Sequence, residues 1–380
     1  MYTRLLASHI KNAFSQYPVV TLTGPRQSGK TTLARTEFKQ FDYVSLEDPD
    51  LRAIALEDPR GFLSRYPGSL ILDEIQRCPN LTSYLQNQVD TPGNRRQFLL
   101  TGSHNLSLLE SVSQTLAGRT RFFELLPLSL QEFKNAKKLP DLTTLLLQGG
   151  YPRIYDRGLN AHEWLRDYFR LYVERDLRSL LNVQELDKFE TFVALLAGRV
   201  GQLVNFNSLA TEAGVTQPTT KAWLAALKNT YVCFTLKPHL KNFNKRIVKT
   251  PKVYFYDTGL LCYLLKINSP DILDIHPLRG QVFENFVISE TMKNVLNSAG
   301  DPQLYFWRDQ KGHEVDLVED KSHYLFPIEI KLSSTFNRAF TKNLDYLNKL
   351  QNYDKGKVIY TGDESFHYKN YDIVNWKHIG

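Results

Sequence analysis

Short apolar runs alternate with amphipathic stretches through the first third of the chain. Residues 19–23, 69–73 and 97–101 are three such runs, and their length and composition predict buried strands. Strands of this kind, separated by amphipathic helices, are typical of a parallel sheet that lies between helices. We therefore expect an α/β fold at the start of the chain.

The pattern changes three times further on. From Asn160, a predicted helix cap, apolar and aromatic side chains recur at helical spacing, which suits either core packing or a surface where domains dock. From about residue 208, short helices precede an alternating β segment with many basic residues. The last part predicts one helix and three strands, at residues 281–296, 304–307, 314–318 and 325–330.

Composition excludes several classes of protein. Of the 380 residues, 42% are hydrophobic and 23% are charged, which are values typical of globular rather than disordered or fibrous chains. No apolar run approaches the roughly 18 residues of a membrane span, and the N-terminus lacks the cleavage site of a secretory signal. Cys78, Cys233 and Cys262 are widely spaced, and nothing in the sequence predicts a zinc site. We expect a cytoplasmic protein without disulfides or membrane contact.

The strongest motif follows the first predicted strand. Eight consecutive residues match G-x-x-x-x-G-K-S/T in full: Gly24, Pro25, Arg26, Gln27, Ser28, Gly29, Lys30 and Thr31. The glycines let backbone N–H groups surround one anion at the positive end of the following helix, which includes Thr32. Lys30 would reach the β- and γ-phosphates, and the Thr31 hydroxyl would hold Mg²⁺. The motif therefore predicts a nucleotide site at residues 24–32.

Two carboxylates end the second predicted strand. Asp73 and Glu74 follow an apolar run, as in a Walker B motif, and Asp73 lies 43 positions after Lys30. We expect Asp73 to hold Mg²⁺, directly or through a water molecule. Glu74 would act as the general base that polarises the attacking water.

Three further groups are candidates for the nucleotide site. Ser103, with Thr101 in reserve, stands at the tip of the third strand, where a hydroxyl would orient the water; a plain turn is the alternative. Arg119 or Arg121 would neutralise γ-phosphate charge, in the same or a neighbouring subunit, and we choose Arg119. A structural role is the alternative for both arginines. Arg153 is the nearest candidate for an arginine sensor in a helical lid.

The order of these motifs resembles that of prokaryotic AAA+-superfamily ATPases of the archaeal-ATPase-like kind. The segments that carry the resemblance are residues 24–31, 72–76, 99–103, 116–119, 126–129 and 149–152. The resemblance covers nearly the whole chain and implies binding of ATP with Mg²⁺ and hydrolysis to ADP and phosphate. It also implies that the C-terminal half is the domain of unknown function that is commonly fused to such ATPases.

A helix-turn-helix is predicted in the second half of the chain. Two short helices flank Gly214, and Gln217, Thr219, Thr220 and Lys221 would face outward at the start of the second helix. A β-hairpin, or wing, would follow at residues 231–256. The pattern predicts a winged-helix-like module.

The net positive charge is concentrated in this module. The chain has 47 lysines and arginines against 40 acids, a net charge of +7, but no acid lies between Glu212 and Asp257. That segment holds eight bases, and the other 39 (47 less eight) balance the 40 acids. The residues that we expect to contact DNA phosphates are Lys221, Lys241, Lys245, Arg246 and Lys249. A winged helix that binds protein and has a solvated basic loop is the alternative.

A second group of acids lies near the C-terminus. Asp316 precedes Glu329 by 13 residues, Lys331 follows on the same predicted strand face, and Glu284 in the preceding helix adds another acid. This arrangement resembles restriction-endonuclease-like folds. It implies a second Mg²⁺ held by Asp316 and Glu329 with the Ile330 carbonyl, while Lys331 would assist water or stabilise the phosphate. A degenerate module that only binds nucleic acid or protein is the alternative.

Four domains are expected from these patterns. They are an ATPase core at residues 1–138, a helical lid or linker at 139–184, a winged-helix-like module at 185–276 and a restriction-endonuclease-like α/β domain at 277–380. The first functional hypothesis is an ATPase that drives a DNA-binding, nuclease-like half. The second is an ATP-switched scaffold that binds a protein partner. Assembly into a homo-oligomer is left open by both.

Overall fold

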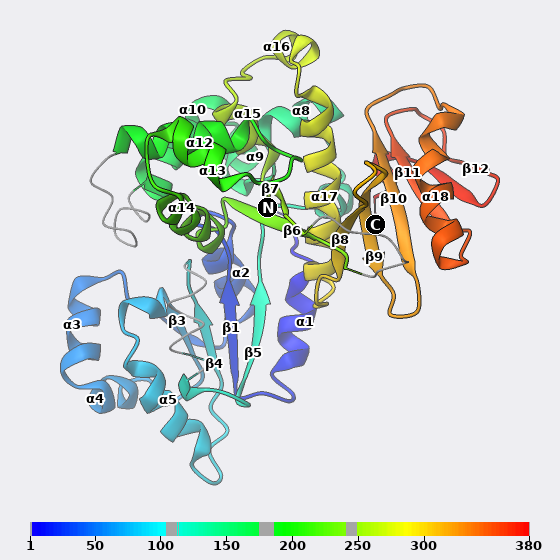
Figure 1. Cartoon of the computed structure of the whole chain (residues 1–380). Helices are drawn as coiled ribbons and strands as arrows, with labels where there is room; N and C mark the ends of the chain where they lie inside the picture. Colours follow the sequence, from blue (N-terminus) through cyan, green and yellow to red (C-terminus); the bar gives the residue numbers. More distant parts are fainter. Residues whose placement is uncertain (1, 104–111, 113, 175–185, 241–248, 380) are drawn as a thin grey trace. The chain divides into compact units, whose positions relative to one another are not determined.

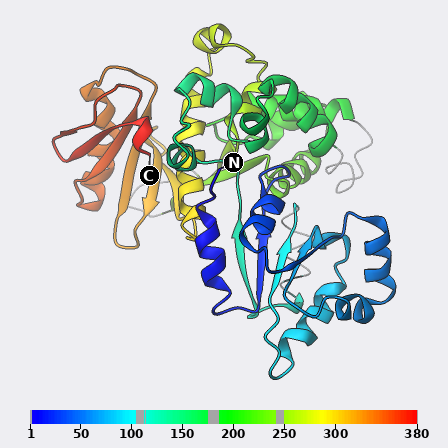
Figure 2. The ribbon, with the colours of Figure 1, turned by 180° about the vertical axis from the view of Figure 1, so that it is seen from behind.

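The computed structural model describes residues 2–103, 112, 114–174, 186–240 and 249–379, which are drawn in colour in Figures 1 and 2. These residues divide into two compact units. Unit 1 contains Met1–Leu128, Asn229–Tyr231 and Leu296–Gly300, and unit 2 contains Ser129–Lys228, Val232–Val295 and Asp301–Gly380. The four-domain division is a finer one, and its boundaries stay predictions.

Unit 1 contains a five-stranded sheet in the order β2-β3-β4-β1-β5, in which every neighbouring pair is parallel (Figure 1). Its strands are β1 (Val19–Thr23), β2 (Asp42–Ser45), β3 (Leu70–Asp73), β4 (Phe98–Thr101) and β5 (Thr120–Glu124). The three strands predicted from sequence are confirmed to within one residue. Since β4 lies between β1 and β3, the tip of β4 separates the P-loop from the Walker B acids.

Apolar side chains along these strands alternate between two cores. Val19 and Leu70 pack in one core, whereas Val20 and Ile71 pack in the other. The helices of unit 1 supply much of the rest of both cores. They are α1 (Leu6–Ala13), α2 (Lys30–Glu37), α3 (Pro49–Glu57), α4 (Pro59–Ser64), the 3-10 turn η1 (Ile75–Arg77) and α5 (Leu81–Asp90). Two cores confirm the predicted parallel sheet between helices.

Unit 2 begins with a set of mostly short helices. They are α7 (Leu130–Asn135), α8 (Leu142–Gln148), α9 (Pro152–Arg157), α10 (Ala161–Tyr168), the π-helix η2 (Phe169–Glu174), α12 (Leu186–Ala197), α13 (Phe206–Ala213), α14 (Gln217–Asn229), α15 (Thr258–Leu264) and α16 (Pro270–Ile275). The predicted cap of α10 is confirmed, because the Asn160 side chain accepts a hydrogen bond from the Glu163 amide. By contrast, α13 starts two residues before Ser208, with Asn205 as its cap.

An eight-stranded mixed sheet forms the rest of unit 2, in the order β12-β13-β11-β10-β9-β8-β6-β7. Its strands are β6 (Cys233–Pro238), β7 (Lys252–Phe255), β8 (Leu304–Arg308), β9 (Glu314–Asp320), β10 (Leu325–Lys331), β11 (Gly356–Tyr360), β12 (Phe366–Tyr368) and β13 (Tyr371–Asn375). The accompanying helices are α17 (Arg279–Asn297), η3 (Arg338–Thr341), α18 (Lys342–Gln351) and η4 (Trp376–His378). The predicted C-terminal helix and strands are confirmed.

The hairpin that we expected as a wing forms one end of this sheet. Strand β6 pairs in parallel with β8, through Lys237 and Tyr305. Strand β7 is the other edge of the hairpin, and its Phe255 N–H and C=O both bond to the buried Asn285 side chain of α17, at 2.7 and 3.1 Å. These contacts satisfy backbone groups that an edge strand would otherwise leave unpaired. Among the described residues, no helix has the length and apolar character needed to cross a membrane.

Gly149 and Gly150 lie against a buried carboxylate. Asp257 caps α15 through the Leu260 amide and also accepts a 2.7 Å hydrogen bond from the Gly150 amide. A Cβ atom at Gly149 would lie 2.1 Å from Asp257 Oδ1, and its φ of +69° is a second reason for glycine. The approach of Asp257 therefore explains the glycine pair.

We predict that Gly149→Ala lowers the free energy of unfolding by about 2–4 kcal/mol, because it adds a clash with Asp257 to a backbone conformation (φ 69°, ψ −154°) that is nearly confined to glycine. Gly158→Ala is the control for left-handed strain without a clash: its φ is 60° and its ψ 41°, and nothing lies within 4 Å of the added Cβ atom. Urea unfolding should show that Gly158→Ala costs only the strain of about 1–2 kcal/mol. Equal costs for both variants would contradict the clash with Asp257.

Candidate functional site

The P-loop backbone is shaped by three residues with positive φ. Gly24, Gln27 and Gly29 have φ values of 144°, 62° and 99°. A Cβ atom at Gly24 would lie 2.2 Å from the Leu125 carbonyl oxygen, so that only glycine fits beside the end of β5. Helix α2 begins at Lys30, directly after the loop. Strand, loop and helix thus follow one another as an anion site at a helix N-terminus requires.

Asp73 is the point at which four elements of unit 1 meet. Thr31 Oγ1 from α2 donates a 2.9 Å hydrogen bond to Asp73 Oδ2, and the Tyr43 hydroxyl from β2 donates one of 2.8 Å. Thr101 Oγ1 at the tip of β4 donates to the other carboxylate oxygen. The structure therefore brings together the two residues expected to hold Mg²⁺. Thr101, the reserve candidate for orienting the water, hydrogen-bonds to the Asp73 carboxylate in this structure.

Glu74 is held in a fixed orientation at the same edge of the sheet. Its φ of 58° lies in the left-handed region. Ser103 Oγ donates a 3.3 Å hydrogen bond to Glu74 Oε2, which also accepts from Gln76 Nε2. Burial raises the pKa of Glu74, and the charge of Lys30 opposes this. Ser103 is thus placed to orient the carboxylate. Sequence analysis missed Gln76, which lies inside the Walker B segment.

Lys30 lies across the P-loop. Its Nζ donates 2.8 Å hydrogen bonds to the carbonyl oxygens of Gly24 and Pro25. Burial lowers the pKa of Lys30 to about 8, although Glu74 and Asp73 act in the opposite direction. The ammonium group is therefore charged at neutral pH and held where it can exchange carbonyl partners for phosphate oxygens.

Arg4 fixes the back of the P-loop, and sequence analysis did not identify it. Its guanidinium donates to the Ser28 carbonyl oxygen at 2.6 Å and to the Leu126 carbonyl oxygen at 2.5 Å. Arg4 is buried, and these bonds join the loop to the segment after β5. No local motif signals such a residue, because its partners lie 24 and 122 positions away.

The other predicted residues of the nucleotide site are more exposed. Arg26 lies 3.6 Å from the Glu47 carboxylate, and Thr32 is exposed on α2. Arg119 is bound to both carboxylate oxygens of Asp90, at 2.6 and 2.7 Å. It precedes β5, at the end of the sheet opposite to the P-loop and about 16 Å away by strand rise. Arg119 therefore lies away from the P-loop of its own chain, and its role in a neighbouring subunit stays a prediction.

The comparisons with known proteins agree with this geometry. A family model described as an AAA domain matches residues 16–134. Two models described as domains of unknown function (DUF8612 and DUF4143) match residues 139–271 and 279–379. Uncharacterized proteins of Mycobacterium bovis and Mycobacterium tuberculosis are 35% identical over 332 residues, which is 87% of this chain and 74% of theirs. The chain belongs to this family of AAA-domain proteins.

Solved structures similar to this AAA-domain protein include two archaeal ATPases. The Walker-type ATPase of Pyrococcus abyssi is 15% identical with a TM-score of 0.45, and the match covers 68% of this chain and 94% of that one. A STAND protein with a tetratricopeptide repeat sensor from Pyrococcus horikoshii is 12% identical with a TM-score of 0.29; the match covers 76% of this chain and 45% of that one.

The C-terminal acids predicted from sequence lie together in unit 2. Lys331 Nζ is 2.7 Å from Glu329 Oε1 and 3.5 Å from Asp316 Oδ2. The Ile330 amide donates a 2.9 Å hydrogen bond to Asp316 Oδ2. Glu284 from α17 is close enough for its charge to act on Glu329. We call Glu284, Glu314, Asp316, Glu329, Lys252 and Lys331 the acid–lysine cluster.

Lys252 is one of the eight bases between Glu212 and Asp257, but it belongs to this cluster. It is 2% exposed, and its Nζ lies 2.6 Å from Glu314 and 3.6 Å from Glu284. Burial acts to lower the pKa of Lys252, but the charges of Glu284 and Glu314 raise it above its ordinary value. The alternation of the hairpin gave no sign of this burial, because the sequence does not show that Glu284 of α17 and Glu314 of β9 lie next to Lys252.

One oxygen atom of the acid–lysine cluster is available to bind a cation. Glu329 Oε2 is a buried oxygen without a hydrogen-bond partner in the described part of the chain. However, no three acid, histidine or cysteine side chains of the described residues form a ready metal site. A bound cation would therefore rest on Asp316 and Glu329 with a backbone carbonyl, as the sequence predicted, rather than on a complete set of side chains.

The predicted DNA contacts are only partly within the described residues. Lys221 is exposed on α14 and Lys249 is exposed before β7. Lys241, Lys245 and Arg246 lie outside the described residues. Thr220, which we expected to face outward, is fully buried and donates to the Gln217 carbonyl oxygen.

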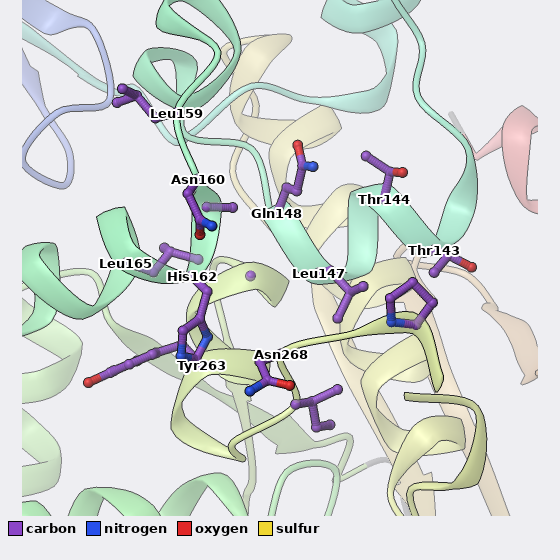
Figure 3. A pocket seen from close by; sticks show the side chains of 14 residues that line it. Thr143, Thr144, Leu147, Gln148, Leu159, Asn160, His162, Leu165, Tyr263 and Asn268 are labelled. Atoms are coloured by element: carbon purple, nitrogen blue, oxygen red, sulfur yellow. The ribbon is translucent and has the colours of Figure 1, made fainter. Parts of the chain in front are cut away.

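A cavity of about 320 Å³ lies among the helices of unit 2 (Figure 3). Asn160, His162, Tyr263 and Asn268 are among the residues that line it. Its lining contains no lysine, arginine or carboxylate. The cavity therefore lacks the charges expected of a site for phosphate or Mg²⁺.

Glu329 should make stability depend on pH. Burial, with the nearby charge of Asp316, raises the pKa of Glu329 from 4.5 to about 8. The unfolded chain releases this proton near pH 4.5, whereas the folded chain keeps it, so the contribution of Glu329 to stability falls as pH rises from 4.5 to about 8. Relative to the parent, Glu329→Gln should gain about 4 kcal/mol in free energy of unfolding between pH 5 and 8, because each pH unit between the two pKa values costs about 1.4 kcal/mol.

Urea unfolding at a series of pH values measures this gain. Glu319→Gln, on the neighbouring strand β9, is the control, because it removes a half-buried carboxylate outside the cluster. Parallel pH profiles for the parent and Glu329→Gln would contradict the assigned protonation.

Proposed function

We propose that the AAA domain binds ATP with Mg²⁺ and hydrolyses it to ADP and phosphate. The observation that carries the proposal is the 2.9 Å contact between Thr31 Oγ1 and Asp73 Oδ2, with Lys30 and Glu74 beside it. A hydroxyl and a carboxylate in contact after a P-loop and a β-strand are the ligand set that Mg²⁺–nucleotide sites use. These residues fit the metal because both are hard oxygen ligands.

Each residue then has a distinct part in hydrolysis. The backbone N–H groups of the P-loop bind the phosphates, and Lys30 neutralises the β- and γ-phosphate oxygens. Thr31 and Asp73 would hold Mg²⁺, which would supply positive charge to neutralise the phosphates. Glu74, oriented by Ser103, accepts a proton from the attacking water. The raised pKa of Glu74 makes it a stronger base than a solvated carboxylate.

We predict that Lys30→Ala abolishes phosphate release because phosphate binding is lost. Glu74→Gln should still bind ATP but turn it over about 10²–10⁴-fold more slowly, which is the usual contribution of a general base. Glu37→Gln is a matched control, because Glu37 ends α2 and pairs with Lys11. Phosphate release and binding of a fluorescent ATP analogue separate the two steps. Turnover by Glu74→Gln at the parental rate would contradict its role as base.

As a second activity we propose metal-dependent cleavage of a phosphodiester at the acid–lysine cluster. The supporting observations are the unpartnered Glu329 Oε2 beside Asp316 and the position of Lys331 Nζ next to both carboxylates. Asp316 and Glu329 would hold Mg²⁺, whose charge would stabilise the leaving oxygen. Lys331 would stabilise the phosphate. Lys221, Lys241, Lys245, Arg246 and Lys249 would supply contacts to the DNA backbone.

We predict Mg²⁺- or Mn²⁺-dependent cleavage of DNA that Asp316→Asn reduces at least about 100-fold, because one of only two carboxylate ligands changes. Linear, circular and single-stranded DNA are the substrates to compare on gels. Asp320→Asn, at the far end of the same strand, is the control. Equal cleavage by the parent and Asp316→Asn, or no cleavage of any substrate, would contradict the nuclease proposal. The alternative function would then be an ATP-switched scaffold that binds a protein partner and has a degenerate cluster.

A further inference from the structure

A buried pair of hydroxyl groups joins the end of β1 to the segment that follows α14. Thr23 Oγ1 and the Tyr231 hydroxyl oxygen are 2.8 Å apart, and the two residues are 1% and 2% exposed. Thr23 is the last residue of β1 and directly precedes Gly24 of the P-loop. Tyr231 belongs to unit 1 with Asn229 and the residue between them, although the chain before and after belongs to unit 2.

The backbone of Tyr231 is held in an unfavourable conformation. Its φ is 58°, in the left-handed region where bulky side chains are rare. The Val232 amide bonds to the Leu227 carbonyl oxygen at 2.9 Å, so Tyr231 occupies the position after α14 that usually carries glycine. Such a residue persists only where other contacts fix it. The buried contact with Thr23 is one of those contacts.

We propose that Tyr231 is a positioning residue that transmits the nucleotide state of the P-loop to α14. The proposal rests on ATP binding by the P-loop, as proposed above. Lys30 Nζ bonds to the Gly24 carbonyl oxygen at 2.8 Å, and phosphate oxygens compete for this ammonium because charge-assisted hydrogen bonds are stronger. Release of the Gly24 carbonyl changes the restraint on Thr23, and the buried hydroxyl pair passes this change to Tyr231.

Helix α14 extends the effect into unit 2. It spans Gln217–Asn229 and is continuous with the segment that carries Tyr231. A helix of 13 residues moves largely as one body, about 20 Å long. Lys221 and the other exposed residues at its start would therefore respond to ATP. The conformation of the predicted helix-turn-helix would therefore depend on whether ATP is bound to the P-loop.

Hydrogen exchange of the α14 amides, with and without Mg²⁺–ATP, tests this link in the full chain. In the parent, ATP should change protection along residues 217–229. In Tyr231→Phe, which loses only the hydroxyl, the change should fall at least about fivefold, the worth of one hydrogen bond. ATP affinity, measured separately, should stay within about threefold, because the hydroxyl that is removed bonds to Thr23, which precedes the P-loop.

Three variants make the test specific. Thr23→Val should lose the response, whereas Thr23→Ser, which retains the hydroxyl, should keep it. Tyr151→Phe is the matched control, because the Tyr151 and Tyr168 hydroxyls form another buried pair, 3.0 Å apart, within unit 2. Should Tyr231→Phe fail to fold, the Thr23→Val and Thr23→Ser pair supplies the result.

A full response in Tyr231→Phe or Thr23→Val would overturn the link, as would ATP binding by the parent without any response in α14. Failure of the parent to bind ATP would overturn the proposed function as well. The separate binding measurement distinguishes these outcomes.

Discussion

The arrangement of the proposed nucleotide site in unit 1 depends on the carboxylate of Asp73. Buried acids need partners, and Asp73 finds hydroxyl donors on three other elements: Thr31 on α2, Tyr43 on β2 and Thr101 on β4. These bonds fix the start of α2, and with it Lys30, relative to the Walker B strand. The parallel sheet makes this possible, because the carboxyl ends of its strands meet at one edge.

In unit 2 the buried acids have lysines as partners instead of hydroxyl groups. Lys252 lies between Glu284 and Glu314, and Lys331 lies between Asp316 and Glu329. Each lysine lowers the cost of burying the acids beside it. The cluster draws on β7, α17, β9 and β10, so the hairpin that follows α14 and the C-terminal strands share one set of buried charges.

Local patterns predicted much of the fold and of the site. Apolar runs located the strands, and the spacing around Lys30 and Asp73 predicted a contact that the structure contains. The spacing of Asp316, Glu329 and Lys331 likewise predicted three side chains that lie together.

Residues whose partners are remote in sequence could not be found in this way. The side chain of Arg4 bonds to a carbonyl 122 positions away, and Lys252 pairs with an acid 62 positions away. Tyr231 contacts a threonine 208 positions earlier. Periodicity reports which face of an element is apolar, but not which element covers it. For the same reason, the pattern of the hairpin did not predict the burial of Lys252.

The central claim is that Thr31 and Asp73 hold Mg²⁺ with ATP. Its most direct test is the equilibrium affinity for ATP with and without Mg²⁺, in the parent and in Asp73→Asn. We predict that Mg²⁺ raises the affinity of the parent by about tenfold or more, and that Asp73→Asn loses most of this gain. An equal Mg²⁺ effect in both proteins, or no ATP binding by the parent, would contradict the account.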